Sequence, residues 1–154
     1  MYLYALDLSM SCSGVVVFDL NTLEPALITS IPTNDKYSHG IRLRHLALEL
    51  EKIILQYEPS VIVIERTFNR FPTATAVLYK THGVVNYLFH NYEQVYYSPK
   101  EIKKEIANVG NATKQKVQAV IKRKYPEVSF NNEDESDAFA IGLTWLIRNK
   151  KIVW

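Results

Sequence analysis

Three stretches of apolar residues near the N-terminus predict β-strands. Residues 2–8 and 14–20 are rich in β-branched and aromatic side chains, and a serine-rich turn separates them. Residues 26–31 would add a third strand and complete a meander. The first stretch is apolar on both faces, as in a central strand covered on both sides, until Asp7 interrupts it. Burying an unpaired carboxylate is costly, so we expect Asp7 to have a partner.

The pattern then changes to the spacing of a helix. Between residues 38 and 57 apolar side chains recur every three or four positions, with charged side chains opposite them. Residues 61–64 follow as an unbroken apolar run, which is typical of a buried parallel strand, and the run ends on Glu65. A helix and a strand after a meander predict an α/β layer architecture with a mixed sheet. Active groups gather at the carboxyl ends of the strands in such sheets, and both Asp7 and Glu65 lie at these ends.

The second half of the chain predicts one more strand and four helices. The strand covers 94–97, and the helices are expected over about 72–88, 99–108, 113–125 and 134–149. Ser98 to Glu101 form a capping box with proline at the first helical position. The helix that Pro72 opens has an apolar stripe from Ala74 to Leu88 that should face the core. Gly83 lies inside this helix, which favours close approach of a neighbour, either the core or a second subunit.

Composition and charge narrow the class of protein. At 154 residues the chain is expected to form one domain, residues 1–154. A single cysteine excludes an internal disulfide framework, and no window approaches the length that crosses a bilayer, so we expect a soluble cytoplasmic protein. Residues 99–124 hold eight Lys or Arg against two Glu. Such a segment suits a protein that grips a polyanion, although a solvated helix face has the same composition.

The start of the last helix concentrates negative charge. Glu133, Asp134, Glu135 and Asp137 place four carboxylates in five positions, and Asp134 and Asp137 project from the same face of a helix. The helix dipole needs only one acid, so the excess favours a bound cation. Glu133 and Glu135 are expected to be solvated, although either could replace Asp134 as a ligand.

Together with Asp7 and Glu65, the pair Asp134 and Asp137 forms a hard oxygen-ligand set. Such a set suits Mg²⁺ or Mn²⁺ and argues against zinc. Two such ions can polarise a phosphodiester, generate hydroxide and stabilise the leaving oxygen. Lys114 is the candidate to neutralise charge on the phosphate.

Four motifs, taken in order, resemble the RuvC family of Holliday-junction resolvases. They are Ala5-Leu6-Asp7, residues 63–68, residues 102–118 and residues 134–138. The resemblance covers essentially the whole chain. It implies an RNase H-like fold, with a central mixed five-stranded sheet flanked by helices. It also implies a homodimer that cuts opposed strands of branched DNA with Mg²⁺, on four-way junctions and as further candidates three-way and Y-shaped forms.

The resemblance further implies roles for single residues. Asp7, Glu65, Asp134 and Asp137 take the places of metal ligands, and Lys103 and Lys114 fall where the family has catalytically important lysines. Phe68 falls where the family places an aromatic residue near the bases of the junction, although it could equally be a core residue. The residues expected to contact DNA are Arg66, Phe68, Arg70, Lys100, Lys103, Lys104, Lys114 and Lys116.

Two departures from the family pattern resemble divergent phage-encoded resolvases. Asp7-Leu8-Ser9 stands in place of an Asp-Pro-Gly type of turn, and Asn108 stands where a glycine is common. Three other functions remain open. They are a nuclease of the same fold that processes structured RNA, as YqgF-like enzymes do, an actin-like ATPase or sugar-kinase lobe, and a non-catalytic DNA-binding module built on the basic helices.

Overall fold

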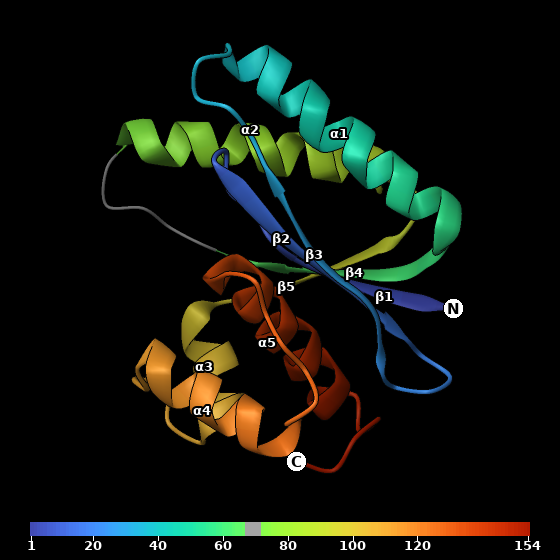
Figure 1. The fold of residues 1–154 in the computed structure, drawn as a ribbon, viewed down its shortest axis with the longest axis vertical. Helices are drawn as coiled ribbons and strands as arrows, with labels where there is room; N and C mark the ends of the chain where they lie inside the picture. The colour runs from blue at the N-terminus through green and yellow to red at the C-terminus, as the bar shows by residue number, and fades with distance from the viewer. Residues whose placement is uncertain (67–71) are drawn as a thin grey trace.

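The computed structural model describes residues 1–66 and 72–154, and its centre is a five-stranded sheet (Figure 1). The strands are β1 (Tyr2–Asp7), β2 (Cys12–Asp19), β3 (Pro25–Pro32), β4 (Pro59–Glu65) and β5 (Glu93–Tyr97). They lie in the order β3-β2-β1-β4-β5. The meander of the first three is antiparallel, whereas β4 and β5 join β1 in parallel. The mixed five-stranded sheet expected from the sequence is therefore confirmed.

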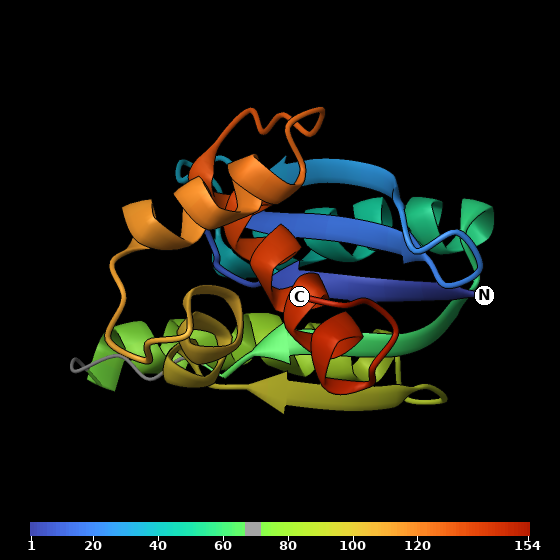
Figure 2. The same ribbon diagram turned by 90° about the horizontal axis from the view of Figure 1, so that it is seen from below.

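Helices cover both faces of this sheet. The helices α1 (His39–Gln56) and α2 (Pro72–Leu88) lie on one face, and α3 (Pro99–Ala107), α4 (Lys114–Lys124) and α5 (Glu133–Arg148) lie on the other (Figures 1 and 2). Alternate strand residues point to opposite faces. Leu3 and Ala5 of β1 therefore join the core beneath α5, while Tyr4 and Leu6 join the core beneath α1 and α2. This double coverage explains why β1 and β4 are apolar without alternation.

Local signals set the ends of the helices on the α5 side. The capping box at Ser98 is present, with Glu101 accepting from the Ser98 backbone N–H at 2.8 Å. Asn108 ends α3 in the left-handed conformation, with φ of 59°. Asparagine adopts this conformation more readily than other residues with a side chain, so it can end the helix in the place where glycine is the usual residue. No helix in the two described ranges combines the length and hydropathy that a bilayer span requires.

Two expectations for α2 need correction or refinement. Ala74 was expected to face the core, but it is exposed, because the first turns of α2 extend past the sheet (Figure 1). Gly83 is also exposed, and a Cβ built there would meet nothing within 4 Å. Gly83 therefore does not serve to let α2 approach the core closely, which leaves a second subunit as the other expected neighbour.

Candidate active site

Asp7 and Glu65 are brought together by strand pairing. Leu6 of β1 pairs with Ile64 of β4 in the parallel register. Asp7 and Glu65 are the next residues along, and adjacent strands are separated by about 4.8 Å. The two acids therefore share the carboxyl edge of the sheet, as the sequence pattern predicted.

A cavity of about 420 Å³ opens at this edge and collects charged residues from distant parts of the chain. Asp7 and Glu65 line it from the sheet, Asp137 from α5, Lys103 from α3 and Lys114 from α4. Its other walls are the loop residues Leu8 and Ser9 and the helix residues Leu78, Pro99, Ile102, Val117 and Ala140. The cavity thus has two walls of opposite charge. The negative wall carries Asp7, Glu65 and Asp137, and the positive wall opposite it carries Lys103 and Lys114.

The described lining of the cavity holds more carboxylates than ammonium groups, namely three acids against two lysines. Burial, followed by the charges of Glu65, Asp137 and Asp134, raises the pKa of Asp7 to about 7. Lys114 opposes this shift in the pKa of Asp7, and its Nζ lies 2.5 Å from Oδ2 of Asp137, a hydrogen bond that raises the pKa of Lys114. A further positive charge, such as a metal cation, would relieve the repulsion that remains.

The raised pKa of Asp7 predicts how stability depends on pH when divalent cations are absent. In the unfolded chain an aspartate titrates near 4, so between about pH 4 and 7 the folded protein binds more protons than the unfolded chain. Stability should therefore fall as pH rises through this window, by on the order of 3 kcal/mol. Thermal unfolding in EDTA at pH 5 and pH 8 measures this loss. Asp7→Asn should largely remove it, and an unchanged loss in that variant would assign the effect to another group.

Asp134 lies near the cavity but does not line it. Its backbone oxygen approaches Gly14 so closely that a Cβ on Gly14 would stand 1.9 Å away. Gly14 is in turn the residue of β2 that pairs with Asp7. The Asp134 carboxylate faces the thiol of Cys12, and burial together with that carboxylate raises the pKa of Cys12 to about 11. The start of β2 therefore seats the beginning of α5 against the strand that carries Asp7.

The expectation that Glu135 is solvated is wrong. Glu135 is 2 % exposed, and its carboxylate accepts from the Asn131 backbone N–H at 2.7 Å and from the Ser30 hydroxyl at 3.3 Å. Asn132 caps α5 by accepting from the Glu135 N–H at 3.0 Å. Glu135 thus fastens the start of α5 to β3, which sequence proximity did not suggest. Glu133 is solvated as expected, with 74 % of its side chain exposed.

The positive wall is held in place by contacts with α5 and the C-terminal segment. Arg148 donates to Glu101 and Glu105 of α3, each at 3.0 Å, and stacks over the ring of Tyr97. Hydrogen bonds from Ser98 and Arg148 lower the pKa of Glu101 to about 2, so the contact persists across the usual pH range. Trp154 donates to the Ile106 carbonyl at 2.9 Å and packs beneath the Lys124 ammonium. These contacts fix where α3 presents Lys103.

The other residues expected to bind DNA fall into three groups. Lys100, Lys104 and Lys116 are exposed on α3 and α4. Arg66 is exposed directly after Glu65 and does not line the cavity, and its guanidinium lies over the Tyr96 ring at 5.7 Å. Phe68 and Arg70 lie outside the described residues.

Sequence reasoning did not identify Ser9, Cys12 or Gly14 as neighbours of the acids. Their proximity depends on the register of the β1–β2 pair and on where α5 crosses it. The only signal in the sequence was the serine-rich turn directly after Asp7.

Comparison with known proteins identifies the family. Residues 10–145 match the model of the crossover junction endodeoxyribonuclease RuvC family. The chain belongs to the RuvC family. It is 30 % identical over 153 residues to RuvC of Rickettsia massiliae, covering 96 % of this chain and 98 % of that protein. RuvC of Chloroherpeton thalassium is 33 % identical over 138 residues, covering 85 % and 68 %.

Solved RuvC structures share the fold. Thermus thermophilus RuvC in complex with a Holliday junction substrate matches with a TM-score of 0.87 at 16 % identity, covering 98 % of this chain and 96 % of that one. The yeast mitochondrial Holliday junction resolvase matches with a TM-score of 0.61 at 16 % identity, covering 94 % and 78 %. The expected RNase H-like fold is confirmed. The divergent, phage-type character of the chain stays a prediction.

RuvC nucleases are metal-dependent as a family. The described cavity lining offers only carboxylates as anionic donors, which suits a hard cation. Within residues 1–66 and 72–154, no three His, Cys, Asp or Glu side chains already surround a common point. Asp137 is engaged by the Lys114 ammonium instead.

Proposed function

We propose that this chain is a Holliday-junction-resolving endonuclease that hydrolyses phosphodiesters with two Mg²⁺ ions, for which Mn²⁺ can substitute. The observation that carries the proposal is the cavity in which Asp7, Glu65 and Asp137 meet Lys103 and Lys114. A module that only binds DNA has no use for a group of half-buried carboxylates, which repel phosphate. Family membership adds the reaction class, since the relatives are crossover junction endodeoxyribonucleases.

Asp7, Glu65, Asp134 and Asp137 would hold the ions. Asp7 and Glu65 are anchored on the sheet, while Asp137 would exchange the Lys114 ammonium for a cation. The geometry supports Asp134 as a ligand less directly than the other three acids. Its charge raises the pKa of Asp7, but its side chain does not line the cavity. When bound, the ions polarise the phosphodiester, activate water and stabilise the leaving oxygen.

Lys114 and Lys103 would act on the phosphate from the positive wall. An ammonium released from Asp137 can neutralise the charge that develops on the phosphoryl oxygens. Lys100, Lys104 and Lys116, together with Arg66, Phe68 and Arg70, would hold the surrounding DNA. The substrate is branched DNA, that is, four-way junctions and, as further candidates, three-way and Y-shaped forms, and each protomer contributes one catalytic domain.

The direct test uses synthetic four-way, three-way, Y-shaped and linear DNA with a structured RNA as a further substrate. We expect paired nicks in opposed strands of the four-way junction in Mg²⁺ and none in EDTA. Preferential cutting of the RNA would instead favour a processing nuclease of the same fold.

Gly14→Ala should disturb the site by displacing the start of α5. A Cβ at position 14 would overlap the Asp134 backbone, so the helix must shift and the spacing of the carboxylates must change. We expect cleavage at saturating protein to fall about tenfold or more, and the rise in melting temperature on adding Mg²⁺ to shrink.

The matched control for Gly14→Ala is Gly142→Ala on the same helix. Its Cβ would meet the Phe18 ring at 2.3 Å, at a position five residues beyond Asp137. Both variants should be less stable, and they are compared at a temperature where each is folded. Equal cleavage and equal Mg²⁺ response in the two variants would show that Gly14 matters only for stability.

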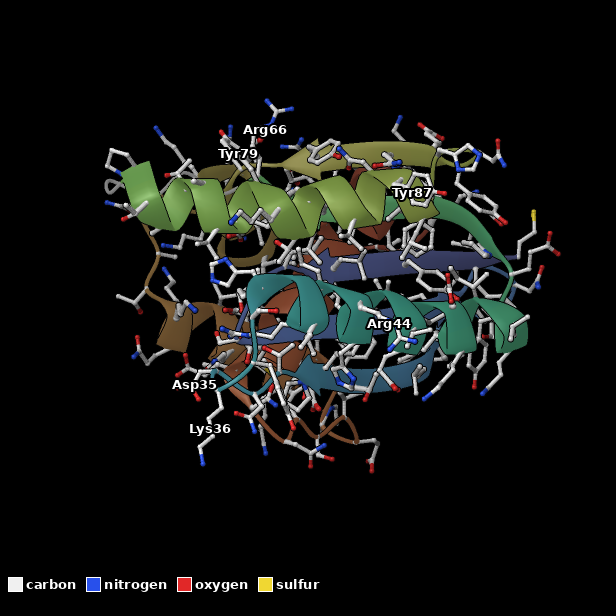
Figure 3. The ribbon with its side chains drawn as sticks, turned by 90° about the horizontal axis from the view of Figure 1, so that it is seen from above. Asp35, Lys36, Arg44, Arg66, Tyr79 and Tyr87 are labelled. Carbon is white, nitrogen blue, oxygen red and sulfur yellow. The ribbon has the colours of Figure 1, made fainter. Side chains whose placement is uncertain are left out.

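A homodimer is proposed through the outer face of α2. Tyr79 and Tyr87 are 54 % and 78 % exposed on this face, on either side of the open Gly83 (Figure 3). Two aromatic side chains around a glycine, four residues apart in each direction, allow close approach of a second helix. On this proposal, the neighbour that approaches Gly83 is the second subunit.

Gly83→Arg should convert the dimer into a monomer, because a long charged side chain would occupy the point of closest approach. Light scattering at micromolar concentration measures the mass. Leu55→Arg introduces the same side chain at an 87 % exposed position of α1 and should stay dimeric. A dimeric Gly83→Arg protein would place the interface elsewhere.

A further inference from the structure

A second hollow lies beside the candidate active site on the side opposite to the lysines of α3 and α4. It measures about 320 Å³ and is lined by the β1–β2 turn and the starts of α1 and α2. Ser9 and Leu78 line both this hollow and the acid-lined cavity. The two hollows are therefore immediate neighbours at the carboxyl edge of the sheet, with Ser9 and Leu78 between them.

The second hollow is basic where the first is acidic. His39 of α1 lies on its wall, and Nζ of Lys80 on α2 stands 3.2 Å from the His39 Nδ1. When the ammonium donates to Nδ1, the imidazole keeps an Nε2–H that can donate outward. The pair thus offers a full positive charge and a second donor at one point.

No acid neutralises this pair in the parts of the chain that the structure describes. Lys80 takes part in none of the ion pairs found there, and the described lining of the hollow contains no carboxylate. Asp35, in the loop before α1, points away from α2 (Figure 3). The positive charge is therefore available to an anion from outside.

Arg42 also lines the hollow but is already engaged. Its Nε donates to the Thr33 hydroxyl at 2.8 Å, and a terminal nitrogen donates to the Met10 carbonyl at 3.0 Å. These bonds hold the β1–β2 turn against α1. Arg42 therefore shapes the hollow, and His39 and Lys80 are the groups free to bind.

We propose that His39 and Lys80 form a subsite for a backbone phosphate of the DNA strand that crosses the acid-lined cavity. This inference rests on the proposed nuclease function and extends it. Lys103 and Lys114 would hold the strand at the scissile phosphate, and His39 and Lys80 would hold it at a neighbouring phosphate on the opposite side of the cavity. An ammonium and an imidazole N–H recognise a phosphate oxygen without reading a base, so the subsite would act on any sequence.

The test measures the affinity of the full-length protein for a labelled four-way junction, in EDTA, across a series of salt concentrations. Lys80→Ala should weaken binding on the order of tenfold at low salt and reduce the slope of log K against log salt by about one. His39→Ala should weaken binding less. The double variant should lose little more than Lys80→Ala alone, because the two side chains serve one phosphate.

The matched control is Lys52→Ala, which removes the same charge from α1 where Lys52 pairs with Glu49 at 2.6 Å. Its salt slope should equal that of the wild type. If the slopes of Lys80→Ala and Lys52→Ala agree, the subsite does not exist. A Lys80→Ala protein that light scattering shows to be monomeric would also overturn the proposal, since the loss would then belong to the α2 interface. A wild-type protein that neither binds nor cuts the junction would refute the nuclease function itself.

Discussion

Asp7→Asn is expected to reduce junction cleavage in Mg²⁺ by about 10³-fold or more while leaving junction binding in EDTA nearly intact. Asparagine keeps the size of the side chain but removes the charge that would hold a cation at the centre of the cavity. Asp7 is the acid on which Glu65, Asp137 and Asp134 all act, so its loss weakens the entire negative wall. Glu65→Gln should behave in the same way.

Single-turnover cleavage and metal-free binding, measured on the same preparations, separate the two effects. Asp35→Asn removes one carboxylate from an exposed loop and should cut at the wild-type rate. Full activity of Asp7→Asn in Mg²⁺ would remove this residue from the site. A parallel loss of cutting and binding would mean that the substitution damages the fold instead.

Lys114→Ala should slow cleavage about 10²-fold, which is more than it weakens binding. The ammonium now held by Asp137 at 2.5 Å is the positive charge best placed to meet the reacting phosphate. Removing it leaves Asp137 without its counter-charge, so a higher affinity for Mg²⁺ should accompany the slower reaction. This opposite movement of rate and metal affinity distinguishes a role in the chemical step from a role in DNA grip.

Lys116→Ala on the same helix provides the comparison for Lys114→Ala. Lys116 is exposed and does not line the cavity, so its loss should lower affinity and leave the rate at saturation unchanged. If Lys114→Ala loses rate and affinity equally, Lys114 only anchors phosphate.

The fold could be predicted from sequence because its signals are local. The unbroken apolar runs of β1 and β4 reflect a sheet covered on both faces, and the capping box at Ser98 sets the start of α3. Asp7 and Glu65 could be paired for a related reason, because strand ends in a parallel pair meet at one edge.

The features that sequence reasoning missed depend on contacts between distant segments. Glu135 looks like a solvated acid until β3 places Ser30 beside it, 105 residues away in the chain. Lys80 and His39 are 41 residues apart and meet only because α1 and α2 share a face of the sheet. Gly14 looks like an ordinary strand residue, since nothing local reveals that a helix backbone will lie against it.

The division of the cavity into two walls has a consequence for how such proteins diversify. The acids of the candidate active site lie on the sheet and α5. Lys103 and Lys114 lie instead on α3 and α4, and hydrogen bonds from Arg148 and Trp154 hold α3 in place. Substitutions at the exposed positions of residues 99–124, such as Lys100, Lys104 and Lys116, can therefore accumulate without altering the acids. A lineage could exchange this hairpin to suit a new branch geometry and inherit the cutting chemistry unchanged, which makes the hairpin the natural segment to graft between relatives.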